Sequence, residues 1–84
     1  MYNYKEMKPR VFTKEGQKKL LKIIMNCKER KESGMSCITV QDMLKGVLGD
    51  SWVMLACIDW LEELEEIRLI KKGKRTRDNV YRIY

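Results

Sequence analysis

The most suggestive chemistry of this chain lies near its C-terminus, where residues 71–77 read KKGKRTR and include five Lys or Arg. No acid interrupts this basic run before Asp78. Lys and Arg that neutralise phosphates release counterions, so such a run gives salt-dependent and mostly sequence-independent affinity for nucleic acid. An Arg at its tip can also enter a narrow A·T-rich minor groove. The alternative is an ordinary solvated loop. We expect contacts to nucleic acid from Lys71, Lys72, Lys74, Arg75, Thr76 and Arg77.

The net charge of +6 is divided into three blocks along the chain. Residues 1–49 carry 11 Lys or Arg against 5 Asp or Glu, residues 50–67 carry none against 6, and residues 68–84 carry 7 against 1. Because the acidic middle block repels phosphates, only the two flanking blocks suit a polyanion. In the first block, Lys14, Lys18 and Lys22 recur every four residues. A solvated helix face is the ordinary explanation of this spacing. Lys18 and Lys22 are weaker candidates for contact with nucleic acid.

Residue types that carry catalysis are scarce. The chain has no histidine, and Cys27, Cys37 and Cys57 are odd in number and share no CxxC spacing. There is no glycine-rich phosphate loop, and the acid pairs of residues 62–66 fall side by side on a helix surface. We therefore expect no enzyme, no metal site, no cofactor and no small-molecule substrate. The three cysteines are expected to be free, as small hydrophobic residues in a reducing compartment.

The length of 84 residues allows one small domain. Leu, Ile, Val, Met and two Trp supply enough apolar side chains for a compact interior. No apolar run approaches the roughly 18 residues of a membrane span, and no signal peptide opens the chain. We expect a soluble cytoplasmic protein with no membrane partner.

The hydrophobic spacing predicts two helices in the first half of the chain. One spans residues 14–31 and is capped by Thr13. After a short extended link at residues 36–38, the other spans residues 40–48, capped by Thr39 and ended by Gly49. The inward stripe expected for the first of these helices consists of Leu20, Leu21, Ile24 and Cys27.

A third helix is predicted over residues 51–67, with Asp50 or Ser51 as its cap. Two β segments follow, one from Ile67 and one reading VYRIY, and the basic run joins them into a hairpin. Residues 1–12 are expected to form an N-terminal arm, either flexible or packed through its tyrosines, and residues 13–84 the domain. The inward stripe expected for the third helix consists of Met54, Cys57, Ile58, Leu61 and Leu64.

The order of these elements resembles the winged helix-turn-helix family over residues 13–84. The turn TVQDMLKGVLGDS has the capped short helix, the glycine and the second cap, and WLEELEEIRLI is similar to the family's exit from its third helix into the first wing strand. KKGKRTRDN would be the wing tip and VYRIY the returning strand. The resemblance implies a small α+β fold of three helices, a short first strand and a C-terminal two-stranded wing. It also implies that the third helix enters the major groove of DNA while the wing touches the backbone or minor groove.

The expected third helix departs from this family, because residues 50–67 contain no Arg, Lys, Asn or Gln to read bases. Glu65 also stands where the family often has glycine. Ser51 remains as a further candidate contact to DNA. An exposed apolar patch usually marks an interface, so this helix is instead a candidate surface for a protein partner. The outward residues of that candidate surface are Trp52, Leu55, Ala56 and Asp59.

The sequence is therefore compatible with two functions. The first is a small DNA-binding winged-helix protein, a transcriptional regulator that grips double-stranded DNA through its basic wing with weak sequence preference. The second is a protein-interaction module, or a homodimer, that uses the apolar and acidic third helix. The two readings combine if a homodimer formed through that helix presents two wings to DNA.

Overall fold

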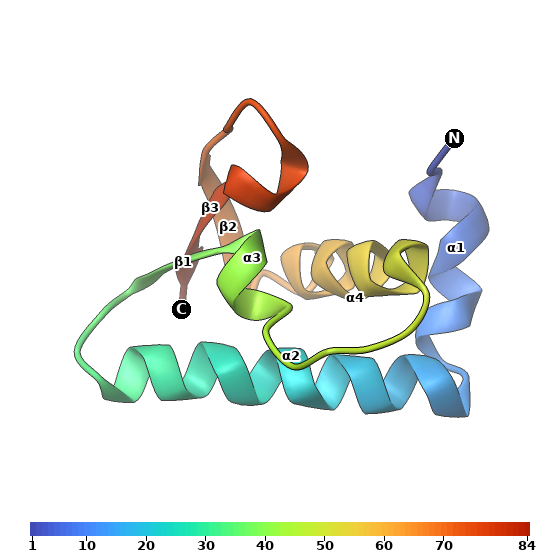
Figure 1. The fold of residues 1–84 in the computed structure, drawn as a ribbon, viewed down its shortest axis with the longest axis horizontal. Coiled ribbons are helices and arrows are strands. Elements are labelled where there is room, and N and C mark those ends of the chain that lie inside the picture. Colours follow the sequence, from blue (N-terminus) through green and yellow to red (C-terminus); the bar gives the residue numbers. More distant parts are fainter.

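Four helices and three strands follow one another along the 84 residues that the computed structural model describes. The helices are α1 (Tyr4–Val11), α2 (Lys14–Glu32), α3 (Val40–Met43) and α4 (Ser51–Glu63). The strands are β1 (Cys37–Thr39), β2 (Ile67–Lys71) and β3 (Val80–Ile83), and a short 3₁₀ helix, η1 (Thr76–Asp78), precedes β3. In Figure 1, α2 runs along the bottom, α4 lies above it, and the loop between β2 and β3 projects at the top. The predicted α+β class is confirmed, with one helix more than expected.

Side-chain caps start the helices where the sequence predicts. The Thr13 hydroxyl accepts a hydrogen bond from the Gly16 N–H at 3.1 Å, and the Thr39 hydroxyl accepts one from the Asp42 N–H at 3.1 Å. At α4 the cap is Asp50, whose Oδ1 accepts from the Trp52 N–H at 2.9 Å. These bonds satisfy backbone donors that a helix leaves open at its N-terminus, and they fix the first residue of each helix.

The sheet has β3 at its centre, paired antiparallel with β1 on one side and β2 on the other. Ile38 and Leu69 both lie opposite Tyr81, and Ile67 lies opposite Ile83. These residues face the helices, and Ile38, Tyr81, Ile67 and Ile83 are buried. The predicted hairpin is confirmed. The segment predicted as an extended link forms β1, which adds one more strand to the hairpin.

The core is formed where α2, α4 and the sheet meet. Four of the five inward positions expected on α4 are at most 7% exposed, namely Met54, Cys57, Ile58 and Leu61. The fifth, Leu64, is 49% exposed because α4 has already ended there. Burial raises the pKa of the Cys27 and Cys57 thiols to about 11, so both remain protonated and pack as small hydrophobic groups.

The inward stripe expected for α2 is partly wrong. Leu20 and Cys27 are buried, but Leu21 is 61% exposed and Ile24 is 41% exposed, while Ile23 is fully buried. The start of α2 packs closely against the end of α1. A Cβ atom at Gly16 would come within 2.5 Å of the Val11 carbonyl oxygen, so only glycine permits this approach.

The helix expected at residues 40–48 ends at Met43. Asn26 of α2 donates from its side-chain amide to the carbonyl oxygens of Met43 at 2.8 Å and Lys45 at 2.9 Å. Gly46 then adopts a φ of +77°, which turns the chain away from the helical path. Leu48, expected inward, is consequently 83% exposed.

Residues 1–12 are not extended. Most of them form α1, which is capped by Asn3 and ends at the fully buried Val11. Tyr2 and Tyr4 pack against the core on the side of α4. Of the two alternatives for the N-terminal segment, the structure shows the packed one.

Candidate nucleic-acid interface

The basic run begins with Lys71 at the end of β2 and continues through the loop that leads to β3. The side chain of Asn79 accepts a hydrogen bond from the Gly73 N–H at 2.8 Å, which ties the two ends of the loop together. The backbone of Asn79 also accepts from the Val40 N–H at 3.0 Å and so anchors the loop to α3. A Cβ atom at Gly73 would lie 2.5 Å from the Cβ of Asp78, so the loop folds tightly on itself. These contacts present the basic run on a defined projection (Figure 1).

The cations of this projection are exposed and have no internal partner. The ion pairs of the molecule are Lys8–Glu63, Arg10–Glu15, Lys19–Glu15 and Arg30–Asp42, all of them outside residues 67–84. Thr76 is also exposed. Six of the candidate residues are therefore brought together by the fold with their charges or donors free: Lys71, Lys72, Lys74, Arg75, Thr76 and Arg77.

The outward face of the sheet continues the positive charge, which the sequence reasoning missed. Arg68 on β2 lies directly opposite Arg82 on β3, and both side chains are exposed. The Arg82 guanidinium lies 5.6 Å from the centre of the Tyr84 ring. The signal was present in the strands, because residues flanking each Arg point inward and alternation along a strand then places the Arg outward.

Three other candidate contacts lie apart from the basic run. Lys18 and Lys22 belong to α2, on the side of the domain opposite the projecting loop (Figure 1). The end of the Lys22 side chain lies beside Gly46, between α3 and α4. Ser51 is exposed in the first turn of α4, whereas β2, which leads to the basic run, follows the other end of that helix. The fold therefore does not join these residues to the basic run in one surface.

The face of α4 expected to point outward is partly covered by α1. Trp52 is 43% exposed and Leu55 is half-buried, but Ala56 is fully buried, so its assignment to a partner surface is wrong. Asp59 and Trp60, which follow Ala56 by three and four residues on the same side of the helix, contact Tyr2 and Phe12. Trp60 is half-buried, with the edge of Phe12 against its ring at 5.0 Å between centroids.

Polar groups of α1 and of the residues before it also engage the acids of α4. The Tyr2 hydroxyl donates to Asp59 Oδ2 at 2.6 Å, the Tyr4 hydroxyl donates to Glu63, and Lys8 pairs with Glu63 at 2.9 Å. Burial raises the pKa of the Asp59 carboxyl, while the bond from Tyr2 acts in the opposite direction. The bonds from Tyr4 and Lys8 lower the pKa of Glu63. These acids are therefore held by the chain itself.

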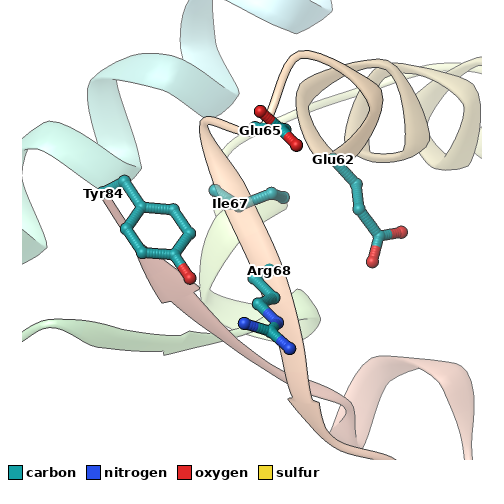
Figure 2. A pocket seen from close by; sticks show the side chains of 5 residues that line it. All are labelled: Glu62, Glu65, Ile67, Arg68 and Tyr84. Carbon is teal, nitrogen blue, oxygen red and sulfur yellow. The ribbon is translucent and has the colours of Figure 1, made fainter.

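A surface cavity of about 480 Å³ lies where α4 leads into β2. Figure 2 shows its lining, with Glu62 and Glu65 at the end of α4, Ile67 and Arg68 on β2, and Tyr84 beyond β3. The lining mixes both signs of charge, and no group of three Cys, Asp or Glu side chains gathers in the molecule to hold a metal ion. None of the helices combines the length and apolar character needed to cross a membrane.

Comparisons of the chain with protein-family models, with curated proteins and with solved structures found no match.

Proposed function

We propose that this protein is a small winged-helix DNA-binding protein, with the β2–β3 hairpin as its wing. The observation that carries the proposal is the projection of five exposed Lys or Arg side chains, none of which is paired within the chain. An exposed and uncompensated group of cations on a rigid loop neutralises phosphates at little cost in ordering. The order of elements from α2 to β3, and a sheet with β3 at its centre, support the winged-helix assignment.

The proposed contact extends from the wing tip to the outward face of the sheet. Arg68 and Arg82 lie on the strands that carry the basic run, and neither forms an ion pair. In α4, by contrast, the accessible side chains are Ser51, Trp52 and acids, and α1 covers part of the surface. Because such a helix offers few donors to base edges, we expect weak sequence preference and a regulatory role that depends on the backbone contact.

The test is a titration with random-sequence duplex DNA at two salt concentrations, followed by fluorescence anisotropy. A variant with Lys72, Lys74, Arg75 and Arg77 changed to Ala should lose at least about tenfold in affinity at the lower salt concentration. The slope of log affinity against log salt should become shallower by up to about 4.

The matched control removes four positive charges elsewhere, by changing Lys5, Lys14, Lys18 and Lys22 to Ala. Its affinity should fall much less than that of the wing variant, because these residues lie outside the wing. An equal loss in both variants would mean that overall charge, or α2, attracts DNA. Unchanged binding by the wing variant would overturn the proposal.

The second candidate function is a protein-interaction module that uses α4. It is favoured by Trp52, which remains 43% exposed in the first turn of the helix, with Leu55 beside it. A loss of self-association on Trp52→Ala, measured by sedimentation velocity, would support this alternative. An unchanged sedimentation profile for Trp52→Ala would remove the case for self-association through α4.

A further inference from the structure

An apolar groove of about 410 Å³ lies between the C-terminal half of α2, the end of α4 and the C-terminus. We call it the α2–α4 groove. Three large side chains that line it are Ile24, Leu64 and Tyr84, which are 41%, 49% and 51% exposed. Side chains of this size cost free energy when water surrounds them, and a groove lined by several of them usually marks an interface.

The exposed apolar surface continues along α2 beyond the groove. Leu21 and Met25 are 61% and 47% exposed, and they lie three residues before and one residue after Ile24. On a helix, positions 21, 24 and 25 share one side. This side is distinct from the core-facing side of α2, which carries Leu20, Ile23 and Cys27. The helix therefore has a second apolar side with no partner in the chain.

The rim of the α2–α4 groove carries both signs of charge on opposite edges. Lys28 and Lys31 line it from α2, and Glu66 lines it from the turn after α4. None of the three forms an ion pair within the chain. Glu62 and Glu65 line the neighbouring cavity, which shares Ile67 and Tyr84 with the groove (Figure 2). The apolar floor thus has two unpaired lysines on the side of α2 and the unpaired Glu66 on the side of the turn after α4, beyond which Arg68 accompanies Glu62 and Glu65.

This arrangement is complementary to itself. In a two-fold contact, residue i of one protomer meets residue j of its partner and residue j meets residue i. A two-fold axis that runs along the groove, parallel to its two edges, would therefore bring each basic edge against an acidic edge while the apolar floors cover each other. A partner of a single charge sign would leave one edge repelled. We infer that a second copy of this chain covers the α2–α4 groove, which makes the protein a homodimer.

The inferred dimer leaves the wings free. The groove involves Ile67, Ile83 and Tyr84, at the base of the hairpin, whereas the basic run is at its opposite end (Figure 1). Both basic loops would then remain exposed in the dimer. The inference does not depend on the proposed DNA binding, because it concerns the free protein and rests on a different surface.

The test is the oligomeric state of the free protein across a range of concentrations, measured by sedimentation velocity and light scattering. The wild-type protein should form a dimer. Two charge-reversal variants, K28E/K31E and E65K/E66K, should each raise the dimer dissociation constant at least about tenfold, because both contacts of the two-fold then oppose like charges. All four residues are exposed, so circular dichroism should show wild-type helix content for both variants.

Mixing the two reversed variants gives the sharpest outcome. In the mixed dimer, the reversed basic edge of one protomer would face the reversed acidic edge of its partner, so that contact again joins opposite charges. The second contact would join the two edges that neither variant changes, and dimerisation should return to near the wild-type level. The control Trp52→Ala lies outside the groove and should leave the dimer unchanged. A monomeric wild-type protein, or a dimer that neither reversal weakens, would overturn the inference, as would reversed variants that do not recover on mixing.

Discussion

The hydroxyl of Tyr2 donates a 2.6 Å hydrogen bond to the carboxylate of Asp59, which lies 57 residues further along the chain. This bond joins the segment before α1 to the middle of α4, and Tyr4 and Lys8 extend the contact to Glu63. The N-terminal segment therefore covers part of the outward face of α4 around Asp59 and Glu63. This cover leaves fewer polar side chains of α4 accessible than the hairpin offers, which agrees with placing the proposed DNA contact on the hairpin.

Replacing Tyr2 with Phe should destabilise the fold by about 1 kcal/mol, because a half-buried carboxylate then loses its hydrogen-bond donor. Urea unfolding followed by circular dichroism measures the change. Tyr84→Phe is the matched control, since the Tyr84 side chain is exposed and its hydroxyl forms no hydrogen bond within the chain. Equal stability of Tyr2→Phe and wild type would show that the N-terminal segment does not hold α4 in solution.

Replacing Asp59 with Asn should change how stability depends on pH. Because burial raises the pKa of Asp59 in the folded state, that state binds its proton more readily than the unfolded chain does. The contribution of Asp59 to stability is therefore lost as pH rises from its ordinary pKa of about 3.9 through the raised value. Asn removes this loss and can still accept a hydrogen bond from Tyr2.

The stability of Asp59→Asn should accordingly match that of wild type below about pH 3.5, exceed it by an amount that grows until pH passes the raised pKa of Asp59, and stay above it by a constant amount at higher pH. Glu15 and Glu63 act in the opposite direction, since hydrogen bonds from Lys19, and from Tyr4 and Lys8, lower their pKa values and their contribution disappears as pH falls. Both glutamates are unchanged in the variant, so the difference between the two unfolding curves isolates Asp59. A variant less stable than wild type at neutral pH would contradict the assignment.

The sequence predicts the elements better than it predicts how they rotate against one another. The caps Thr13 and Thr39 and the hairpin were predicted because local hydrogen bonds and β propensity determine them. The burial of Ala56 was missed because α1 packs on that face of α4, and a short polar helix has a weak signal of its own. The exposure of Leu21 and Ile24 was missed because apolar spacing on α2 does not determine which side of the helix faces the core.

The sequence also predicted only part of the candidate nucleic-acid interface. The basic run could be located because its composition alone implies an exposed loop. Spacing could not show that α2, which carries Lys18 and Lys22, lies on the side of the domain opposite the loop between β2 and β3, because this depends on the tertiary arrangement (Figure 1). The early end of α3 likewise required the side chain of Asn26, which lies on another helix.

Replacing Glu65 with Gly should stabilise the protein. Glu65 has a φ of +60°, the left-handed conformation that glycine adopts without strain. It follows the end of α4, where the Glu65 N–H donates to the Glu62 carbonyl at 2.9 Å and the Glu66 N–H donates to the Leu61 carbonyl at 3.0 Å. These two bonds hold the residue in its strained conformation.

We expect Glu65→Gly to raise the free energy of unfolding by about 1 kcal/mol. Glu62→Gly is the matched control, because that residue lies within α4 and glycine there should cost about 1 kcal/mol. Both are measured by thermal and urea unfolding, at a concentration at which the variants and wild type share one oligomeric state. A destabilised Glu65→Gly would mean that the turn after α4 differs in solution.

Arg68 and Arg82 should repel each other in the free protein and become favourable when DNA binds. They are directly opposite in the β2–β3 pair, where like charges destabilise a sheet by roughly 0.2–1 kcal/mol. A double-mutant cycle of Arg68→Gln and Arg82→Gln separates this repulsion from other contacts, including that of Arg82 with Tyr84. The cycle should give an unfavourable coupling at low salt that shrinks as salt is added.

If the proposed interface extends over the sheet, each single substitution should also weaken DNA binding and make the salt slope shallower by about 1. A single substitution then raises the stability of the free protein and lowers its affinity for DNA. Removing one Arg ends the repulsion between Arg68 and Arg82 and also deprives the complex of a phosphate contact. A purely structural role would lower stability without changing the salt slope. A cycle with no coupling, together with unchanged affinity, would confine the DNA contact to the wing loop.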